Sequence, residues 1–264
     1  MQVSSLRIAQ SIVVCRAVII SQPMMELTKP EDFMPVEEIQ RYEWLLDDTP
    51  EGMLEIQGGC GFSKKLLVVF NHITHLAAMM QQEPRNFSTP MTIQYHLRKL
   101  QGMKQWSRET STFLEASEQS QHIEWVRQAP EEFRIRQRRE MTNVTAECWR
   151  IAAILYLQCR ALRYVSFTSK LTSFNTDRSY YRLPRNHEDV LSNLEDLMMC
   201  IRIMPTSGWL FTAQAPLFPV FLLGILSTEC RHRHIAHRWF EMVTLAPVRS
   251  VSFDRLFYFL SDPS

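Results

Sequence analysis

The stretch PLFPVFLLGILSTECRHRHIAHRWFEMV, residues 216–243, decides the fold class, because it holds two helical patterns joined by a short break. Pro216 and Pro219 fit the first turn of a helix, where a missing backbone N–H costs little. Residues 220–226 are apolar on every face, which predicts a central, buried helix that is too short to cross a bilayer. From Ile235 the pattern changes to a single apolar stripe. This stripe predicts a second helix that covers a core with one side.

The second helix carries an apolar face and a basic face. Ile235, Trp239, Met242 and Val243 form the apolar stripe, and His234, His237 and Glu241 lie opposite. Cys230, His234 and His237 share a face at spacings of four and three residues, but the outer pair is about 10 Å apart along a regular helix. One ion cannot reach both. We therefore predict a solvated basic face and no metal site in this helix.

The helical period recurs along most of the chain. Its clearest case is the segment Phe62–Met80, with Ser63 as N-cap, one apolar stripe, and Lys64, Asn71 and His75 across from that stripe. A second such helix is expected over Thr145–Tyr164, and further helices near residues 36–47, 90–118, 122–140, 187–203 and 252–260. No segment shows a convincing strand pattern. The sequence thus predicts an all-α fold.

Two regions follow from the breaks in this pattern. Residues 1–34 are expected to form a loosely attached N-terminal helix, and residues 35–264 a single multi-helix domain, because no break is long and polar enough for an interdomain linker. The apolar start of the chain is interrupted by Arg16 and is a poor secretory signal. We expect no membrane segment.

Composition argues for a soluble, reduced protein without an overall electrostatic field. Hydrophobic residues make up 45% and charged residues 22%, values typical of globular proteins, and the net charge of +1 cannot by itself hold a polyanion. The six cysteines are widely spaced, with no Cys-x-x-Cys pair, so we interpret them as small core residues and not as zinc ligands or disulfides.

No linear motif of an enzyme is present. The chain lacks a Gly-x-Ser-x-Gly elbow, a phosphate-binding Gly-x-x-x-x-Gly-Lys loop and a Gly-x-Gly-x-x-Gly fingerprint. His72 and His75 could meet on a helix, but no His-Glu-x-x-His arrangement supplies a catalytic carboxylate. We predict no catalytic residue, no cofactor and no metal. An enzyme whose site is assembled from distant helices leaves no such motif, and that alternative stays open, as does a degenerate fragment without activity.

Two charged segments are candidates for partner contacts. The run FRIRQRRE contains Arg134, Arg136, Arg138 and Arg139, which fit a nuclear-import signal or a basic patch, or else a solvated helix face neutralised by flanking glutamates. Residues 31–55 hold nine acidic side chains among aromatic and aliphatic ones, including Tyr42, Trp44, Leu45, Asp47 and Asp48. This segment fits an acidic activation motif, or else an amphipathic helix with Trp44 and Leu45 buried.

Three segments together resemble the regulatory domain of fungal zinc-cluster transcription factors. They are GGCGFSKKLLVVFNHITHLA at residues 58–77, AECWRIAAILYLQCRALR at residues 146–163, and the proline-bounded pair of helices at residues 216–243. Each is a packing motif, and their order and spacing carry the resemblance over most of residues 35–260.

The resemblance implies a helical regulatory domain that acts in the nucleus in transcriptional control. It would bind a like domain, another protein or a small ligand. The six closely spaced cysteines of the zinc-cluster DNA-binding module do not occur in this sequence. The resemblance therefore implies a regulatory domain without its DNA reader, and direct sequence-specific DNA binding is not supported.

Overall fold

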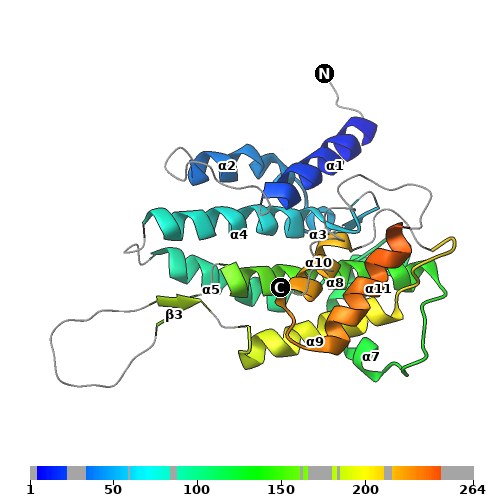
Figure 1. Cartoon of the computed structure of the whole chain (residues 1–264). Coiled ribbons are helices and arrows are strands. Elements are labelled where there is room, and N and C mark those ends of the chain that lie inside the picture. The colour runs from blue at the N-terminus through cyan, green and yellow to red at the C-terminus, as the bar shows by residue number, and fades with distance from the viewer. Residues whose placement is uncertain are drawn as a thin grey trace.

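The longest helix, α8 (Arg138–Arg160), forms the centre of the computed structural model of the protein, where α4, α5, α7, α9 and α10 contact it (Figure 1). Its side chains from residue 144 to residue 158 are all buried. Such a helix, apolar nearly all round, is stable only when other helices surround it. The structure describes residues 5–22, 34–58, 60–83, 88–160, 163–165, 180–182, 185–210 and 216–244.

The described fold is all-α apart from two short strand pairs. The remaining elements, in chain order, are α1 (Ser5–Ser21), α2 (Pro35–Arg41), the 3₁₀ helix η3 (Glu43–Leu46), α3 (Pro50–Leu54), β1 (Ile56–Gln57), β2 (Phe62–Ser63), α4 (Lys64–Gln82), α5 (Ser88–Gln101), α6 (Phe113–Glu118), α7 (His122–Gln128), β3 (Arg163–Val165), β4 (Tyr180–Arg182), α9 (Glu188–Ile203), α10 (Leu217–Leu226) and α11 (Cys230–Thr244). The predicted fold class is confirmed, and none of these helices is long and apolar enough to span a membrane.

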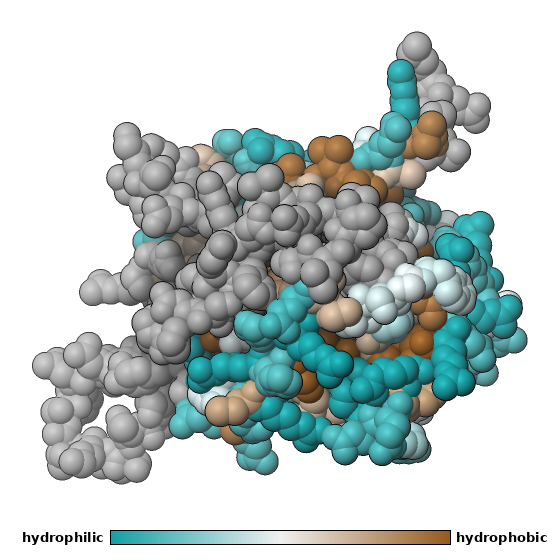
Figure 2. Space-filling view, turned by 45° about the vertical axis from the view of Figure 1, so that its right-hand side comes forward, coloured by the Kyte–Doolittle hydropathy of each residue, from teal (hydrophilic) through white to brown (hydrophobic). Residues whose placement is uncertain are grey.

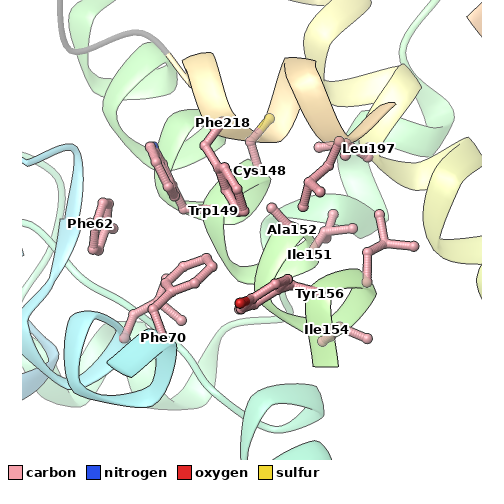
Figure 3. Close-up of a cluster of buried hydrophobic side chains, with 14 of the residues drawn as sticks. Phe62, Phe70, Cys148, Trp149, Ile151, Ala152, Ile154, Tyr156, Leu197 and Phe218 are labelled. Atoms are coloured by element: carbon pink, nitrogen blue, oxygen red, sulfur yellow. The ribbon is translucent and has the colours of Figure 1, made fainter. Parts of the chain in front are cut away.

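An aromatic cluster joins the central elements (Figure 3). The Trp149 ring of α8 lies 4.6 Å from the ring of Phe62, 5.7 Å from that of Phe70 and 6.1 Å from that of Phe218, measured between centroids. Tyr156 extends the cluster about two turns further along α8. Strand β2 and helices α4, α8 and α10 are thus held around one set of rings, whose burial and edge-to-face contacts favour this arrangement.

The N-terminal helix α1 packs against α4 and reaches the aromatic cluster. On α1, Ile12 and Ile19 are buried against α4, and the Arg16 guanidinium lies over the Trp149 ring at 5.3 Å from its centroid. A cation over an indole face gains electrostatic energy from the ring quadrupole. Figure 1 shows α1 and α2 together along the same side of α4. The division of the chain at residue 34 stays a prediction.

Two expected long helices are each broken in the structure. The segment 90–118 contains α5 and α6, because the backbone around Trp106 pairs instead with that around Leu54 and Ile56, with N···O distances of 3.2 and 2.7 Å. Within the segment 122–140 the helix ends at Gln128. Helical geometry is unfavourable for a residue that precedes proline, and Ala129 precedes Pro130. Helix α8 then begins at Arg138, seven residues before the expected Thr145. The helix expected near 252–260 lies outside the described residues.

The expectation of no strands is wrong for two short antiparallel pairs. Strand β1 pairs with β2, so that Ile56 lies opposite Ser63, and β3 pairs with β4. Gly61 adopts a φ of 75° in the turn before β2, a conformation that glycine adopts at little cost. Strands of two or three residues are too short to show the alternation by which a strand is recognised in a sequence.

Helix α4 is also buried on the side across from its apolar stripe. Ser63 caps this helix as predicted, through its hydroxyl and the Leu66 N–H. Asn71 and His75, however, are fully buried, because α2 covers them. The Asn71 amide donates to the Glu38 carbonyl, and His75 Nε2 lies 2.8 Å from Asn71 Oδ1. A polar residue within a helical pattern therefore did not mark an exposed face here.

Exposed apolar side chains gather near the start of the chain. Leu6, Ile8, Val13, Val14 and Val18 of α1 are all exposed, and so are Val36 and Trp44 nearby. In Figure 2 brown atoms gather along the upper edge of the molecule, where Figure 1 shows α1 and α2, while most of the described surface below is teal. Apolar surface that is concentrated on one helix is typical of a contact face.

We predict that Trp149→Ala lowers the free energy of unfolding by about 3–5 kcal/mol, because it removes the ring on which three others and Arg16 pack. Trp209→Ala is the matched control, since Trp209 is 75% exposed and its loss should cost less than about 0.5 kcal/mol. Urea unfolding of both variants measures the difference. Equal effects of the two substitutions would contradict the central role of Trp149.

Candidate ligand cleft

A cleft of about 810 Å³ lies between α4 and α5 and extends to α3 and α6. From α4 it is lined by Lys65, Val68, Val69, His72 and Leu76, and from α5 by Thr92, Tyr95, His96 and Lys99. Both sets recur at intervals of three and four residues, so each is one face of its helix. The cleft's volume lies within the range of small-molecule sites in proteins.

The opposite wall comes from helix α3, helix α6 and the segment between α5 and α6. It consists of Met53 and Leu54 at the end of α3, Met103, Lys104 and Trp106 before α6, and Phe113, Ala116 and Ser117 on α6. Trp106 is fixed by its indole N–H, which donates to the Glu51 carbonyl at 2.9 Å, and by the ring of Phe113 at 6.1 Å. This wall is therefore preformed by contacts among its own residues.

Helix α8 supports the cleft from behind. The buried Arg150 guanidinium pairs with Glu147 at 2.8 Å and donates to the Leu100 carbonyl at the end of α5 at 3.0 Å. Gln105 links two further segments, since it accepts from the Ser63 N–H at 2.7 Å and donates to the Ala146 carbonyl at 2.8 Å. These buried polar contacts fix the end of α5 and the following segment relative to the core.

Two histidines meet in the middle of the cleft. The rings of His72 on α4 and His96 on α5 are edge to face, with centroids 5.2 Å apart. His72 Nε2 is buried and has no hydrogen-bond partner among the described residues. Burial lowers the pKa of His96 to about 4, and the positive charges of His72 and Lys65 act in the same direction. Burial also lowers the pKa of His72. At neutral pH both rings are neutral, so each offers one donor and one acceptor.

The sequence-predicted segments lie elsewhere. Arg134, Arg136, Arg138 and Arg139 are exposed before and at the start of α8, and Arg138 lies 3.5 Å from Glu109. In the acidic segment Tyr42 and Leu45 are buried, Trp44 is 40% exposed, and the exposed Asp48 pairs with Lys64. Neither segment contributes these residues to the cleft. Their roles in nuclear import and activation stay predictions.

The basic helix α11 behaves partly as expected. Trp239 is buried, while Cys230 and His234 are exposed and His237 is half-buried. The structure instead brings together Glu195, Glu229 and His232, whose potential ligand atoms lie within 4.8 Å of one another. His232 Nε2 lies 2.8 Å from the Glu195 carboxylate, and Nδ1 lies 3.0 Å from the Ser227 hydroxyl. This buried histidine thus joins α9 to the start of α11.

Sequence reasoning missed the residues of the cleft. A polar and aromatic face at helical spacing occurs within the expected helix near 90–118, formed by Thr92, Tyr95, His96 and Lys99. This spacing could have indicated a binding face from the sequence alone. That this face lies opposite His72, and not in open solvent, depends on how α4 and α5 pack.

Comparison with protein families gives one match. The model of the fungal specific transcription factor domain matches residues 6–253 of the chain. The chain belongs to this family. The matched range includes α1 and all the helices that form the cleft. The sequence resemblance is thereby confirmed, and it places the domain in transcription regulation. No curated protein and no solved structure matches the chain.

We predict that acid destabilises the domain through the half-buried His96. Folded His96 takes up its proton near pH 4, whereas an unfolded histidine does so near pH 6.5, so stability falls as the pH falls through this window. His96→Gln removes this penalty and should recover about 1–3 kcal/mol of unfolding free energy at the acid end. His234→Gln, at an exposed position on α11, is the control. Melting temperatures across the window would show no difference between the variants if His96 were not involved.

Proposed function

We propose that this domain regulates transcription without catalysis, by binding a small effector in the cleft between α4 and α5. The single observation that carries the proposal is a preformed cleft of about 810 Å³, lined mostly by apolar side chains together with some polar ones, in a chain that belongs to a transcription factor family. Both helices that line it also contact α8. An effector that draws them together would therefore act on the centre of the fold. Nuclear localisation is proposed on the same family membership.

An enzyme is the less well supported alternative. Its strongest candidate is the series Ser227, His232 and Glu195, which has the order of a hydrolytic triad. Ser227 is 4% exposed, and its hydroxyl accepts the Glu229 N–H two residues on at 3.2 Å, as in a serine turn. A nucleophile must reach its substrate, and this hydroxyl is covered. The cleft itself has no acidic residue among its described lining, so it offers no carboxylate as a general base.

A substitution that fills the cleft tests the effector proposal. Thr92 is exposed on α5 and lines the cleft, so Thr92→Trp places an indole in the space that the ligand needs. Gln94→Trp is the matched control, since Gln94 is exposed on the same helix and outside the cleft lining. The chain is fused to a heterologous DNA-binding domain and reporter output is measured over a panel of growth media.

We expect the Thr92→Trp fusion to stay at one output level in media where the parent and Gln94→Trp fusions change theirs. Equal melting temperatures of the two variants exclude misfolding as the reason. A Thr92→Trp fusion that responds to the media as the parent does would contradict regulation through the cleft.

We further propose that a second copy of this domain is the partner that binds the apolar face of α1. Helix α1 carries two charged residues, and one of them, Arg16, points inward onto the Trp149 ring. The outer side of the helix presents the exposed side chains of Leu6, Val13, Val14 and Val18. Two such faces can bury these apolar side chains against each other in an isologous interface.

Leu6→Asp combined with Val14→Asp should convert the dimer into monomer, because each dimer would then bury four carboxylates. Gln94→Asp, at an exposed polar position of α5, should leave the dimer intact. Sedimentation velocity at several concentrations distinguishes the two states. A parent protein that remains monomeric at every concentration would refute the proposed pairing.

A further inference from the structure

The charges around the cleft are of one sign. Lys65, Lys99 and Lys104 line it, and none of its described lining residues is acidic. The chain as a whole is almost neutral, with 29 basic and 28 acidic residues, so this local excess is not a consequence of composition. A cleft with low-dielectric walls and one sign of charge attracts a ligand of the opposite sign.

Unlike Lys64, which lies outside the cleft, the three lysines of the cleft have no carboxylate partner among the described residues. Lys64 pairs with Asp48, but among the described residues no ion pair involves Lys65, Lys99 or Lys104. Lys104 Nζ donates to the Ser117 carbonyl at 2.6 Å, and Lys99 Nζ lies 5.4 Å from the centroid of the Tyr95 ring. These contacts hold the ammonium groups in place without neutralising them.

The packing of α4 against α5 places the ammonium groups of Lys65 and Lys99 toward the same end of the cleft. Helices α4 and α5 pack against each other, and the contact between His72 and His96 sets their relative position. Lys65 lies about two turns before His72, and Lys99 about one turn after His96. Because consecutive helices joined by a short connection run antiparallel, both lysines lie on the same side of the histidine pair. Figure 1 shows the two helices running side by side.

The remaining surface of the cleft is rich in rings. Tyr95, Trp106 and Phe113 line it together with His72 and His96. They form two edge-to-face groups, Trp106 with Phe113 at 6.1 Å and Tyr95 with His96 at 5.7 Å. Ring faces and edges of this kind favour a planar aromatic guest over an equally apolar saturated one. His72 Nε2 adds one buried polar atom that has no hydrogen-bond partner in the described part of the chain.

We propose that the cleft takes an aromatic carboxylic acid, whose carboxylate lies between Lys65 and Lys99 and whose rings pack among Tyr95, Trp106 and Phe113. This inference rests on the proposed effector function and names its ligand class. The charge selects an anion, the rings select a planar body, and the cleft's volume accommodates two or three fused or linked rings.

A matched set of probes tests the class on the whole chain by isothermal titration calorimetry. The probes are para-phenylbenzoate, the neutral para-phenylbenzyl alcohol, the cationic para-phenylbenzylamine and the saturated bicyclohexyl carboxylate. We expect para-phenylbenzoate to bind roughly tenfold more tightly than the alcohol, as a charge-assisted contact does, and more tightly than the other two.

Two substitutions on α5 then locate the carboxylate. Lys99→Met should bring the affinity for para-phenylbenzoate close to that for the alcohol, while the affinity for the alcohol itself changes little. Arg98→Met removes the same charge one residue away, at an exposed position outside the cleft lining, and should leave the preference intact.

The outcomes separate this inference from the proposed function. If the alcohol, the amine or the saturated acid binds as tightly as para-phenylbenzoate, or if Lys99→Met keeps the preference, the ligand class is wrong and the effector cleft stands. If no probe binds, the class is also wrong, and the reporter response of Thr92→Trp decides separately on the cleft.

Discussion

The packing of rings around Trp149 is the constraint on which the rest of this structure depends. A single indole on α8 contacts Phe62 before α4, Phe70 within α4 and Phe218 at the start of α10, and Arg16 of α1 covers it. Segments separated by more than a hundred residues are thus fixed at one point. Because protein interiors are close-packed, moving any one of these elements would open space around the ring or force the others to shift.

The cleft follows from that arrangement. One side of α4 is committed to the aromatic cluster, so its opposite side, which carries Lys65 and His72, is left for α5 and the segments after it. Buried polar contacts of Arg150 and Gln105 hold the end of α5 in position. The cleft can therefore be rigid enough to discriminate between ligands while it remains connected to the core, as a site that controls a regulatory domain needs to be.

The helices with strong periodicity were predictable, and the sites were not. Helix α4, its Ser63 cap and the pair α10 and α11 follow from apolar spacing and proline placement, which are local properties. The break after Gln101 depends on a partner distant in the sequence, through the backbone contact between Ile56 and Trp106, whereas the break after Gln128 follows from the nearby Pro130. The cleft was missed because neither His72 nor His96 is informative until the two rings are known to touch.

The sequence by itself determined that this chain is a helical domain of the fungal transcription factor type, because the order of its apolar helices and their breaks is recorded in the residue pattern. Only the tertiary structure decided that Asn71 and His75 are buried, that Arg16 reaches Trp149, and that three lysines share a cleft with no carboxylate among its described lining residues. The physical reason is that periodicity specifies which face of a helix is apolar. It does not specify which other helix will cover that face, and burial, charge balance and ligand geometry all depend on that choice.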